Sequence, residues 1–507
     1  MKAKLTFIVS IVTLFFIACT DDEIANQDNK DSNSNSALAD EEYTNQWIYD
    51  QMRRVYLWND KLPASPDYMQ HPDKFFYNIL YKYGQVDGDR FSWIEEDKSK
   101  KTATRALFAD VRLGFDCIPM AYFTGNNEPS SVGLFVITVD EGSDAQAKGL
   151  KRGQVIYQVN AINVDSENYR TILDNLTSCT LGVYNSLGRK DVLKTFNASA
   201  SKPSPVFISK VITRSNVKIA YLMYNAFEKN STDIEDSYEY DMELIRSIQN
   251  LKEQGITEFV LDLRYNLGGY LTSAMNLASA LVPNRSTEKI FAKQQYNAHY
   301  TDSLKKMYGA NVFNTYFLDK VYGTNHEIPK LNLNRLYVIA TDYSASASEL
   351  IIHGLRPYMD VYHIGLTTTG KDKASLTIKS NDKRILWQLQ PIISRLTDAK
   401  DEGNYFNGLK PNYEISEWAE GYQMADAYYI DGNGQRVDIQ LPLLSRWKGG
   451  LYELGDPSEP LLATAIEQIT GVARTRSSET TVPDNWIIKR VPQIKLDKKK
   501  AVILIDK

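Results

Sequence analysis

Residues that build many metal and catalytic sites are scarce in this sequence. Its 507 residues include three cysteines and five histidines, and neither Cys117 nor Cys179 stands at a metal-ligand spacing from a similar residue. No Gly-x-Ser-x-Gly or His-Glu-x-x-His motif occurs. We therefore expect no metal and no cofactor. Whether Cys117 and Cys179 form a disulfide stays open, because sequence does not fix their geometry.

The sequence also lacks an excess of basic charge. Its 58 Lys and Arg residues face 63 Asp and Glu residues, which gives a net charge of −5 and argues against a nucleic-acid partner. Beyond about residue 20 there is no apolar run long enough to cross a bilayer. The hydrophobic fraction of 43% is ordinary for globular domains, and the length predicts two to four of them.

The first residues have the composition of an export signal. Lys2 and Lys4 precede an apolar stretch at 5–17, and a small-residue cleavage site ends at Cys19. This pattern resembles a bacterial lipoprotein signal, which implies that residues 1–19 are a signal peptide and that Cys19 is lipidated. An ordinary secretory signal that happens to contain a cysteine is the alternative.

Residues 20–42 contain almost no large apolar side chains, so they cannot bury enough surface to order themselves. We expect a disordered tether there. Its acidic beginning, Thr20–Glu23, resembles a tag that sends some Bacteroidetes lipoproteins to the outer face of the outer membrane, although a solvated linker has the same composition. The predicted location is the cell envelope, as an outer-membrane lipoprotein that is periplasmic or surface-exposed.

Residues 43–105 are predicted to be a helical segment. Ile48, Met52 and Val55 recur at i, i+4 and i+7, and a second apolar run covers 75–83. The aromatic residues of this segment are expected to form a small core rather than a ligand site.

Residues 106–204 change to short strands and turns. An apolar strand at 132–139, a short Ser-x-Ala helix at 141–150 and a Gly-entered strand at 153–160 follow one another. This order resembles a PDZ domain, with Gln154 in place of the usual aspartate. The resemblance implies that the backbone amides of Leu113, Gly114 and Phe115 bind the carboxylate of a peptide chain end. The alternative is a degenerate domain that only braces its neighbour.

Residues 205–450 are predicted to be the largest unit, in which parallel strands alternate with helices. The predicted strands are 218–224, 258–263, 335–340 and 361–365, and the predicted helices are 236–252, 271–282 and 346–357. The polar, aromatic segment 285–330 is expected to be an insertion. A tail at 451–507 contains one predicted helix, at 460–469. The predicted fold class is α/β, arranged as a multi-domain α+β chain.

Ser346 and Lys371 are the candidate catalytic pair. Ser346 precedes an apolar helix, whose positive end would stabilise a developing oxyanion. Lys371 follows Gly370 in a small-residue turn after a strand, 25 positions beyond the serine. A lysine can activate a serine only when it is neutral, and burial favours that state. Either feature alone is common in turns and helix caps.

A third feature is the buried strand that runs from Asp262 into Gly268-Gly269. Glycine amides in such a turn are free of Cβ obstruction, which an oxyanion hole requires. The alternative is a simple tight turn in which Arg264 forms a salt bridge with Asp262.

Together the motifs Asp-Leu-Arg-x-Asn-x-Gly-Gly, Ser-Ala-Ser-Glu and Thr-x-Gly-Lys resemble those of the C-terminal processing peptidases, or tail-specific proteases. The resemblance covers most of residues 43–420. It implies a crotonase-like ββα catalytic core, a protein or peptide substrate, a Ser346 nucleophile and a Lys371 general base.

The family pattern also assigns an oxyanion hole, formed by the amide of Ala347 and the amide of Gly268 or Gly269. This sequence departs from the pattern at two positions. Asp372 replaces a usual glycine, and Ser375 stands where many members have a glutamine that orients the lysine.

Two other functions remain open. The departures from the family pattern at Asp372 and Ser375, together with Gln154, are also consistent with a catalytically weak lipoprotein that only binds peptides. The crotonase fold is shared with acyl-CoA enzymes, but no basic phosphate-binding stretch supports that activity.

Overall fold

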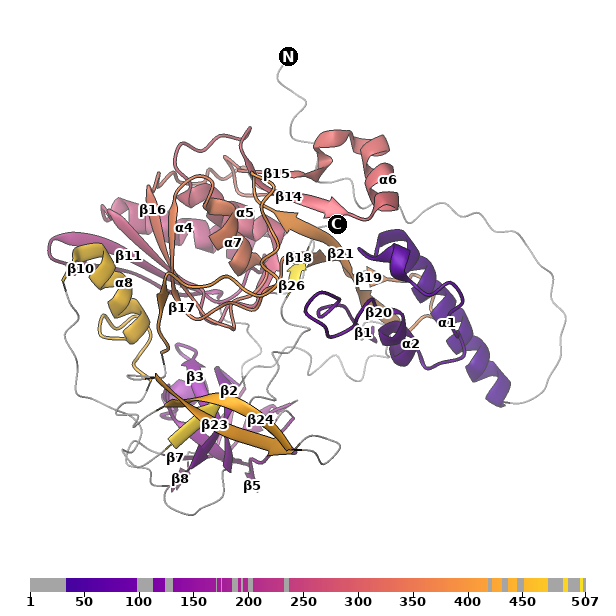
Figure 1. Cartoon of the computed structure of the whole chain (residues 1–507). Helices are drawn as coiled ribbons and strands as arrows, with labels where there is room; N and C mark the ends of the chain where they lie inside the picture. Colours follow the sequence, from indigo (N-terminus) through magenta and orange to yellow (C-terminus); the bar gives the residue numbers. More distant parts are fainter. Residues whose placement is uncertain are drawn as a thin grey trace.

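The computed structural model of the chain describes residues 33–97, 113–123, 131–169, 171–174, 176–184, 190–192, 195–198, 204–231, 237–417, 422–430, 436–444, 451–472, 487–490 and 502–504. Figure 1 shows their arrangement. The predicted signal peptide, with Cys19, lies outside the described residues. Within the described ranges, each helix is too short or too polar to cross a membrane.

The largest unit is built on a six-stranded sheet in which every pair is parallel except the first. In spatial order the strands are β10 (Val206–Arg214), β11 (Val217–Tyr224), β12 (Glu258–Asp262), β16 (Arg335–Ala340), β17 (Asp360–Gly365) and β22 (Tyr413–Glu414). The strands predicted at 218–224, 258–263, 335–340 and 361–365 are confirmed. Parallel strands are buried on both faces, which explains their nearly continuous apolar sequences.

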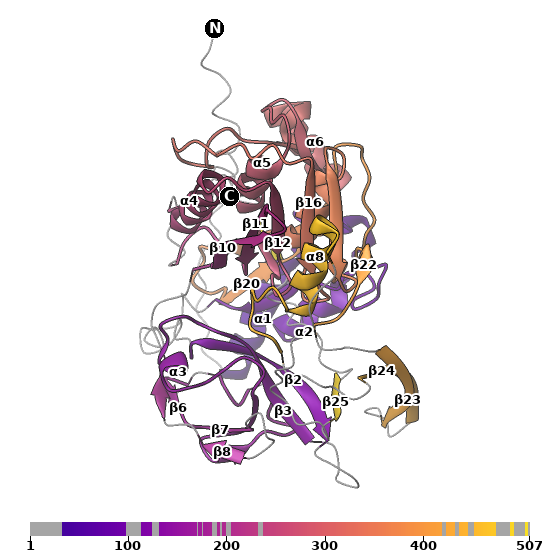
Figure 2. The same ribbon diagram turned by 90° about the vertical axis from the view of Figure 1, so that its left-hand side faces the viewer.

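Helices cover both faces of this sheet. One face packs on α4 (Glu239–Glu253), α5 (Leu271–Leu281) and α7 (Ala347–Leu355). The other face packs on α8 (Pro460–Thr470), which lies against β16 in Figure 2. All four helices were predicted, within a few residues at their ends.

A second six-stranded sheet joins segments that are distant in the sequence. In spatial order its strands are β13 (Gly268–Tyr270), β26 (Val502–Leu504), β18 (Lys373–Ser375), β21 (Ile392–Thr397), β14 (Ile290–Tyr296) and β15 (Asn314–Tyr316).

The segment 285–330 has more regular structure than its sequence pattern indicated. Besides β14 and β15 it contains α6 (Ala298–Tyr308) and the short helix η4 (Ala310–Phe313). Phe291 and Ala292 of β14 are fully buried in the main core. Residues 293–295 of β14 are polar because this end of the strand is only partly buried. The sequence of β14 therefore lacks the apolar pattern of a buried strand.

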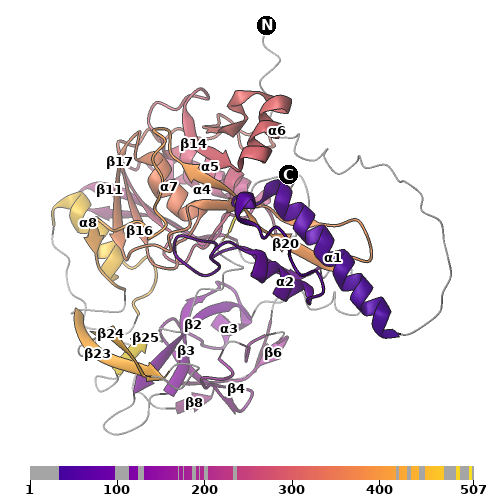
Figure 3. The ribbon, with the colours of Figure 1, turned by 45° about the vertical axis from the view of Figure 1, so that its right-hand side comes forward.

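The N-terminal unit contains α1 (Asn33–Val55), η2 (Asn59–Lys61) and α2 (Pro72–Ile79), and then a strand, β1 (Trp93–Glu96). Because α1 begins at Asn33, the expectation of a disordered tether over residues 20–42 is wrong from that residue onward. The expectation of helix throughout residues 43–105 is also wrong, at β1. This strand pairs with β20 (Trp387–Gln390), which pairs in turn with β19 (Ile378–Lys379). As a result the N-terminal core is shared with a later part of the chain, and Figure 3 shows α1 and α2 beside β20.

The unit whose sequence resembles a PDZ domain, here called the PDZ-like unit, contains among its described residues a sheet and the short helix α3 (Asp144–Ala147). In spatial order its main strands are β25 (Ile487–Arg490), β2 (Phe115–Phe123), β3 (Ser131–Val139), β4 (Val155–Val159), β7 (Leu181–Tyr184) and β8 (Lys190–Val192). The short strand β5 (Ile162–Asn163) pairs with β4. A separate two-stranded sheet consists of β6 (Ser178–Cys179) and β9 (Phe196–Asn197). Cys117 and Cys179 are both thiols. A further hairpin consists of β23 (Tyr422–Ile430) and β24 (Arg436–Leu444).

Candidate active site

A buried ionic cluster holds the strand that leads to the glycine pair. The Arg264 side chain is fully buried and contacts three carboxylates, at 2.7 Å from Asp262, 3.1 Å from Glu417 and 2.8 Å from Glu459. The salt bridge between Arg264 and Asp262, which belongs to the alternative interpretation of this turn, is therefore present. Arg152 of the PDZ-like unit reaches the same cluster at 2.7 Å from Glu417. Carboxylates from three parts of the chain thus surround one guanidinium.

Ser346 stands directly before α7 in a strained turn. Its φ of 64° and ψ of −111° are unusual for a residue other than glycine. Such strain costs about 1–3 kcal/mol and is concentrated at functional sites. The residue is fully buried, and among the described residues its Oγ has no hydrogen-bond partner. The hydroxyl is thus desolvated, and it stands at the helix N-terminus where the sequence predicted it.

Lys371 follows a glycine that the local packing requires. Gly370 has a φ of 84°, and a Cβ there would lie 2.3 Å from the carbonyl oxygen of Phe406. The Lys371 side chain is fully buried. This burial lowers the pKa of Lys371 to about 7, although the nearby carboxylates of Asp89 and Glu349 act in the opposite direction. A buried, largely desolvated amine near neutrality is what a lysine base needs.

Glu349 joins the serine turn to the lysine turn. Its Oε2 accepts hydrogen bonds of 2.8 Å from the backbone amides of both Ser346 and Lys371. Its Oε1 accepts from the Gly370 amide at 2.7 Å and from the Thr368 hydroxyl at 2.5 Å. Burial raises the pKa of Glu349, while these donors lower it. Because one carboxylate oxygen binds both amides, the two predicted catalytic residues lie close together.

The glycine pair lies in β13 and is linked to the serine turn through Asn266. The amide of Gly268 donates to the Asn266 side chain at 2.9 Å. The backbone oxygen of Asn266 accepts from the Ala345 amide at 3.1 Å and from the Ser348 hydroxyl at 2.8 Å. Ala347 is the first residue of α7, where amides have no partner within the helix. The structure thus brings the predicted oxyanion-hole residues beside Ser346.

Ser375 is the last residue of β18, three positions after Asp372. Its hydroxyl accepts a hydrogen bond of 3.0 Å from the side chain of Gln390 in β20. Asp372 is fully buried and pairs with Lys373. Position 375 thus has a serine where many family members have a glutamine, but Gln390 from β20 contacts that serine. Sequence spacing could not indicate this contact, because the two residues lie on different strands.

The strand β26 lies between β13, which holds the glycine pair, and β18, which follows the lysine turn. It is paired in parallel with β13, where Gly269 lies opposite Ile503. It is also paired with β18, where Ser375 lies opposite Leu504. The edges of these strands, beside the glycine pair and beyond the lysine, can therefore bind an extended peptide backbone.

The residues predicted to bind peptides lie in the PDZ-like unit, apart from the serine and lysine turns. The carbonyl of Gly114 accepts from the Asp140 amide at 2.9 Å and from the Ser143 hydroxyl at 3.3 Å. Leu113 and Phe115 flank it at the start of β2.

One histidine lies on the helix that follows Ser346. His353 is buried on α7, and its ring contacts Tyr405. The described residues contain no group of His, Cys, Asp and Glu side chains that could hold a metal ion.

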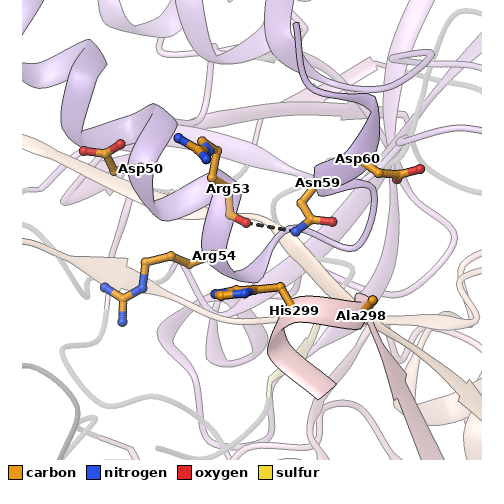
Figure 4. A pocket seen from close by; sticks show the side chains of 7 residues that line it. All are labelled: Asp50, Arg53, Arg54, Asn59, Asp60, Ala298 and His299. Carbon is orange, nitrogen blue, oxygen red and sulfur yellow. Dashed lines mark hydrogen bonds between the residues drawn. The ribbon is translucent and has the colours of Figure 1, made fainter. Parts of the chain in front are cut away.

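A hollow of about 600 Å³ lies elsewhere, between α1, η2 and the start of α6. Figure 4 shows its lining by Asp50, Arg53, Arg54, Asn59, Asp60, Ala298 and His299. None of the predicted site residues lines it.

Comparison with known proteins finds that parts of the chain are similar to serine peptidases. Residues 218–415 match Peptidase family S41, and residues 43–93 match the Peptidase S41 N-terminal domain. The carboxy-terminal processing protease CtpA of Bacillus subtilis is 22% identical over 394 residues, 73% of this chain and 76% of that protein. A CtpA-like serine protease of Staphylococcus aureus N315 is 22% identical over 292 residues, 56% of this chain. This match spans 50% of the length of the staphylococcal protein.

A solved structure agrees with these matches. The crystal structure of a protein described as an S41 protease from Bacteroides fragilis NCTC 9343 superimposes with a TM-score of 0.62 and 25% sequence identity. It covers 84% of this chain and 98% of that chain. Residues 43–93 and 218–415 therefore match peptidase family S41, and the family resemblance inferred from the motifs is confirmed.

Proposed function

We propose that the chain is a serine endopeptidase of the C-terminal processing type, with Ser346 as nucleophile and Lys371 as general base. The observation that carries this proposal is the shared carboxylate of Glu349. Its Oε2 accepts hydrogen bonds from the backbone amides of both Ser346 and Lys371. It therefore holds a strained, desolvated serine close to a buried lysine whose pKa is near 7.

In the proposed reaction, neutral Lys371 takes the proton from Ser346 Oγ as that oxygen attacks the scissile carbonyl. The resulting ammonium then protonates the leaving amine. The acyl group stays on Ser346 until water, deprotonated by the same lysine, releases it.

The negative oxygen of the tetrahedral intermediate requires two donors. We assign the Ala347 amide as one. The second is the amide of Gly268 or Gly269: in this structure the Gly268 amide donates to the Asn266 side chain, and Gly269 lies in the ladder between β13 and β26. The lysine-orienting role suggested for Ser375 would involve Gln390, its hydrogen-bond partner.

We further propose that the PDZ-like unit engages the C-terminal part of a protein substrate through Leu113, Gly114 and Phe115. Lipidation at Cys19 would anchor the enzyme to the outer membrane, in the periplasm or at the cell surface. A pulse of labelled fatty acid, followed by analysis of wild type and Cys19→Ala, tests the anchor independently of catalysis.

The decisive experiment compares the cleavage of an unstructured polypeptide by wild type and Ser346→Ala. We expect cleavage by wild type alone, unaffected by chelators. Equal rates, or no cleavage in any condition, would remove the assignment. A protein that only binds peptides would then be favoured, since β26 shows that these strand edges accept a backbone.

A further inference from the structure

A loop of the N-terminal unit reaches the candidate base. It connects α2 to β1 and places the ring of Phe91 with its centroid 5.0 Å from Lys371 Nζ. Phe91 is 6% exposed and Lys371 is 0% exposed. An apolar ring therefore forms one wall of the lysine pocket, although it is 280 positions away in the sequence.

The neighbour of Phe91 fixes this loop to the lysine turn. The Arg90 guanidinium donates from one nitrogen, Nη2, to the carbonyl oxygens of Gly370 at 2.8 Å and Phe406 at 2.7 Å. One of these carbonyls directly precedes Lys371. Any shift of the loop would therefore disturb the turn that carries the base.

Two further contacts limit how far the loop can move. Asp89 accepts from the backbone amides of Phe91 at 3.0 Å and Ser92 at 2.8 Å. The Ser92 hydroxyl accepts from the Ile392 amide of β21 at 2.9 Å. The position of the ring is thus set by the backbone on both sides of it.

We propose that Phe91 is a positioning residue for Lys371: it excludes water from the amine and so keeps the base neutral. The N-terminal unit would then be a working part of the peptidase site. This inference rests on the proposed function, because it assigns a role toward the proposed base.

The ring has two opposed effects on the lysine. It excludes water, which favours the neutral amine, while its face attracts the ammonium, which favours the charged form. Exclusion of water dominates, because burial is the main cause that lowers the Lys371 pKa. The charged groups that face Lys371 are Asp89 from the loop, Glu349 from α7 and Lys373 from β18. Substitution of Phe91 leaves all three in place.

Two substitutions separate these effects. Phe91→Ala opens the pocket to water and should raise the pKa of Lys371. Phe91→Leu keeps an apolar wall but removes the aromatic face, so the pKa should stay the same or fall. Phe76→Leu in α2 is the control, since it makes the same change in the buried core of the N-terminal unit.

The measurement is the pH dependence of Ser346 labelling by a fluorophosphonate, followed by intact mass on the full chain. For wild type and Phe76→Leu we expect a midpoint near pH 7. For Phe91→Ala the midpoint should rise by at least about one unit, so that labelling at pH 6 is about tenfold slower and recovers above pH 9. For Phe91→Leu it should not rise.

Three outcomes would overturn the inference. One is a Phe91→Ala rate that falls equally at every pH, which indicates packing alone. Another is a midpoint for Phe91→Leu above that of wild type, a test that stands even when Phe91→Ala does not fold. The third is labelling of Ser346→Ala at the wild-type rate, which would refute the proposed function and the inference with it.

Discussion

Replacement of Lys371 by methionine should abolish activity and yet stabilise the fold, by an amount that depends on pH. The pKa of Lys371 falls from its ordinary value of 10.5 to about 7 because the side chain is fully buried. At about 1.4 kcal/mol for each pKa unit, this disfavours the charged native lysine by about 5 kcal/mol. A methionine of similar length has no charge to desolvate.

The sign of the pH dependence follows from proton binding. Between about pH 7 and 10.5 the unfolded lysine holds a proton that the folded lysine does not. The free energy of unfolding of wild type therefore rises by about 1.4 kcal/mol per pH unit in this window through this residue alone. Because the native lysine is still half protonated at pH 7, the advantage of Lys371→Met should shrink by about 2.3 kcal/mol between pH 7 and pH 9.

Urea unfolding of the two proteins at pH 7 and pH 9 measures this difference. Lys305→Met, at an exposed position on α6, is the matched control and should show no such trend. A stability difference between wild type and Lys371→Met that stays constant with pH would refute the argument that the buried lysine is neutral.

Three other changes test the surroundings of the site. Glu349→Gln places an amide group against backbone donors, so it should reduce fluorophosphonate labelling and lower the free energy of unfolding by about 1–3 kcal/mol in urea; unaltered labelling would contradict its clamping role. Arg264→Met leaves Asp262 and Glu459 buried without their cation, which should destabilise the chain by about 3–5 kcal/mol in thermal unfolding, whereas an unchanged transition would show that water reaches the cluster. Because Val502–Leu504 pairs with the strands on both sides of the site, deletion of this segment should raise the hydrolysis rate of a short fluorogenic peptide, and an unchanged rate would mean that the strand leaves the site in solution.

The sequence was most informative where structure is local. The apolar runs of β11, β12 and β16 and the amphipathic pattern of α4 predict their elements within a few residues, because burial imposes a period on consecutive side chains. The candidate serine and lysine turns were also visible as motifs, since each lies at the end of such an element.

Contacts between distant segments could not be predicted in this way. Phe91 shows no sign in its own neighbourhood that it lies over Lys371, and the pairing of β26 with β13 depends on the whole fold. Glu349 is an intermediate case. It stands three residues after Ser346, which is the spacing of a capping box, so its bond to the serine amide could have been predicted. Its bonds to the lysine turn could not.

The arrangement of the site also explains why it lies within the largest core of the molecule. A strained serine costs about 1–3 kcal/mol, and a lysine kept neutral at pH 7 costs about 5 kcal/mol more. Neither turn would persist alone, because each would relax toward an ordinary backbone conformation or a hydrated ammonium. Glu349 binds the backbone of both turns, so one can relax only if the other loses its bond to the same carboxylate. The buried helix α7 supplies both the serine and this carboxylate, and its packing energy therefore stabilises the serine and the base together.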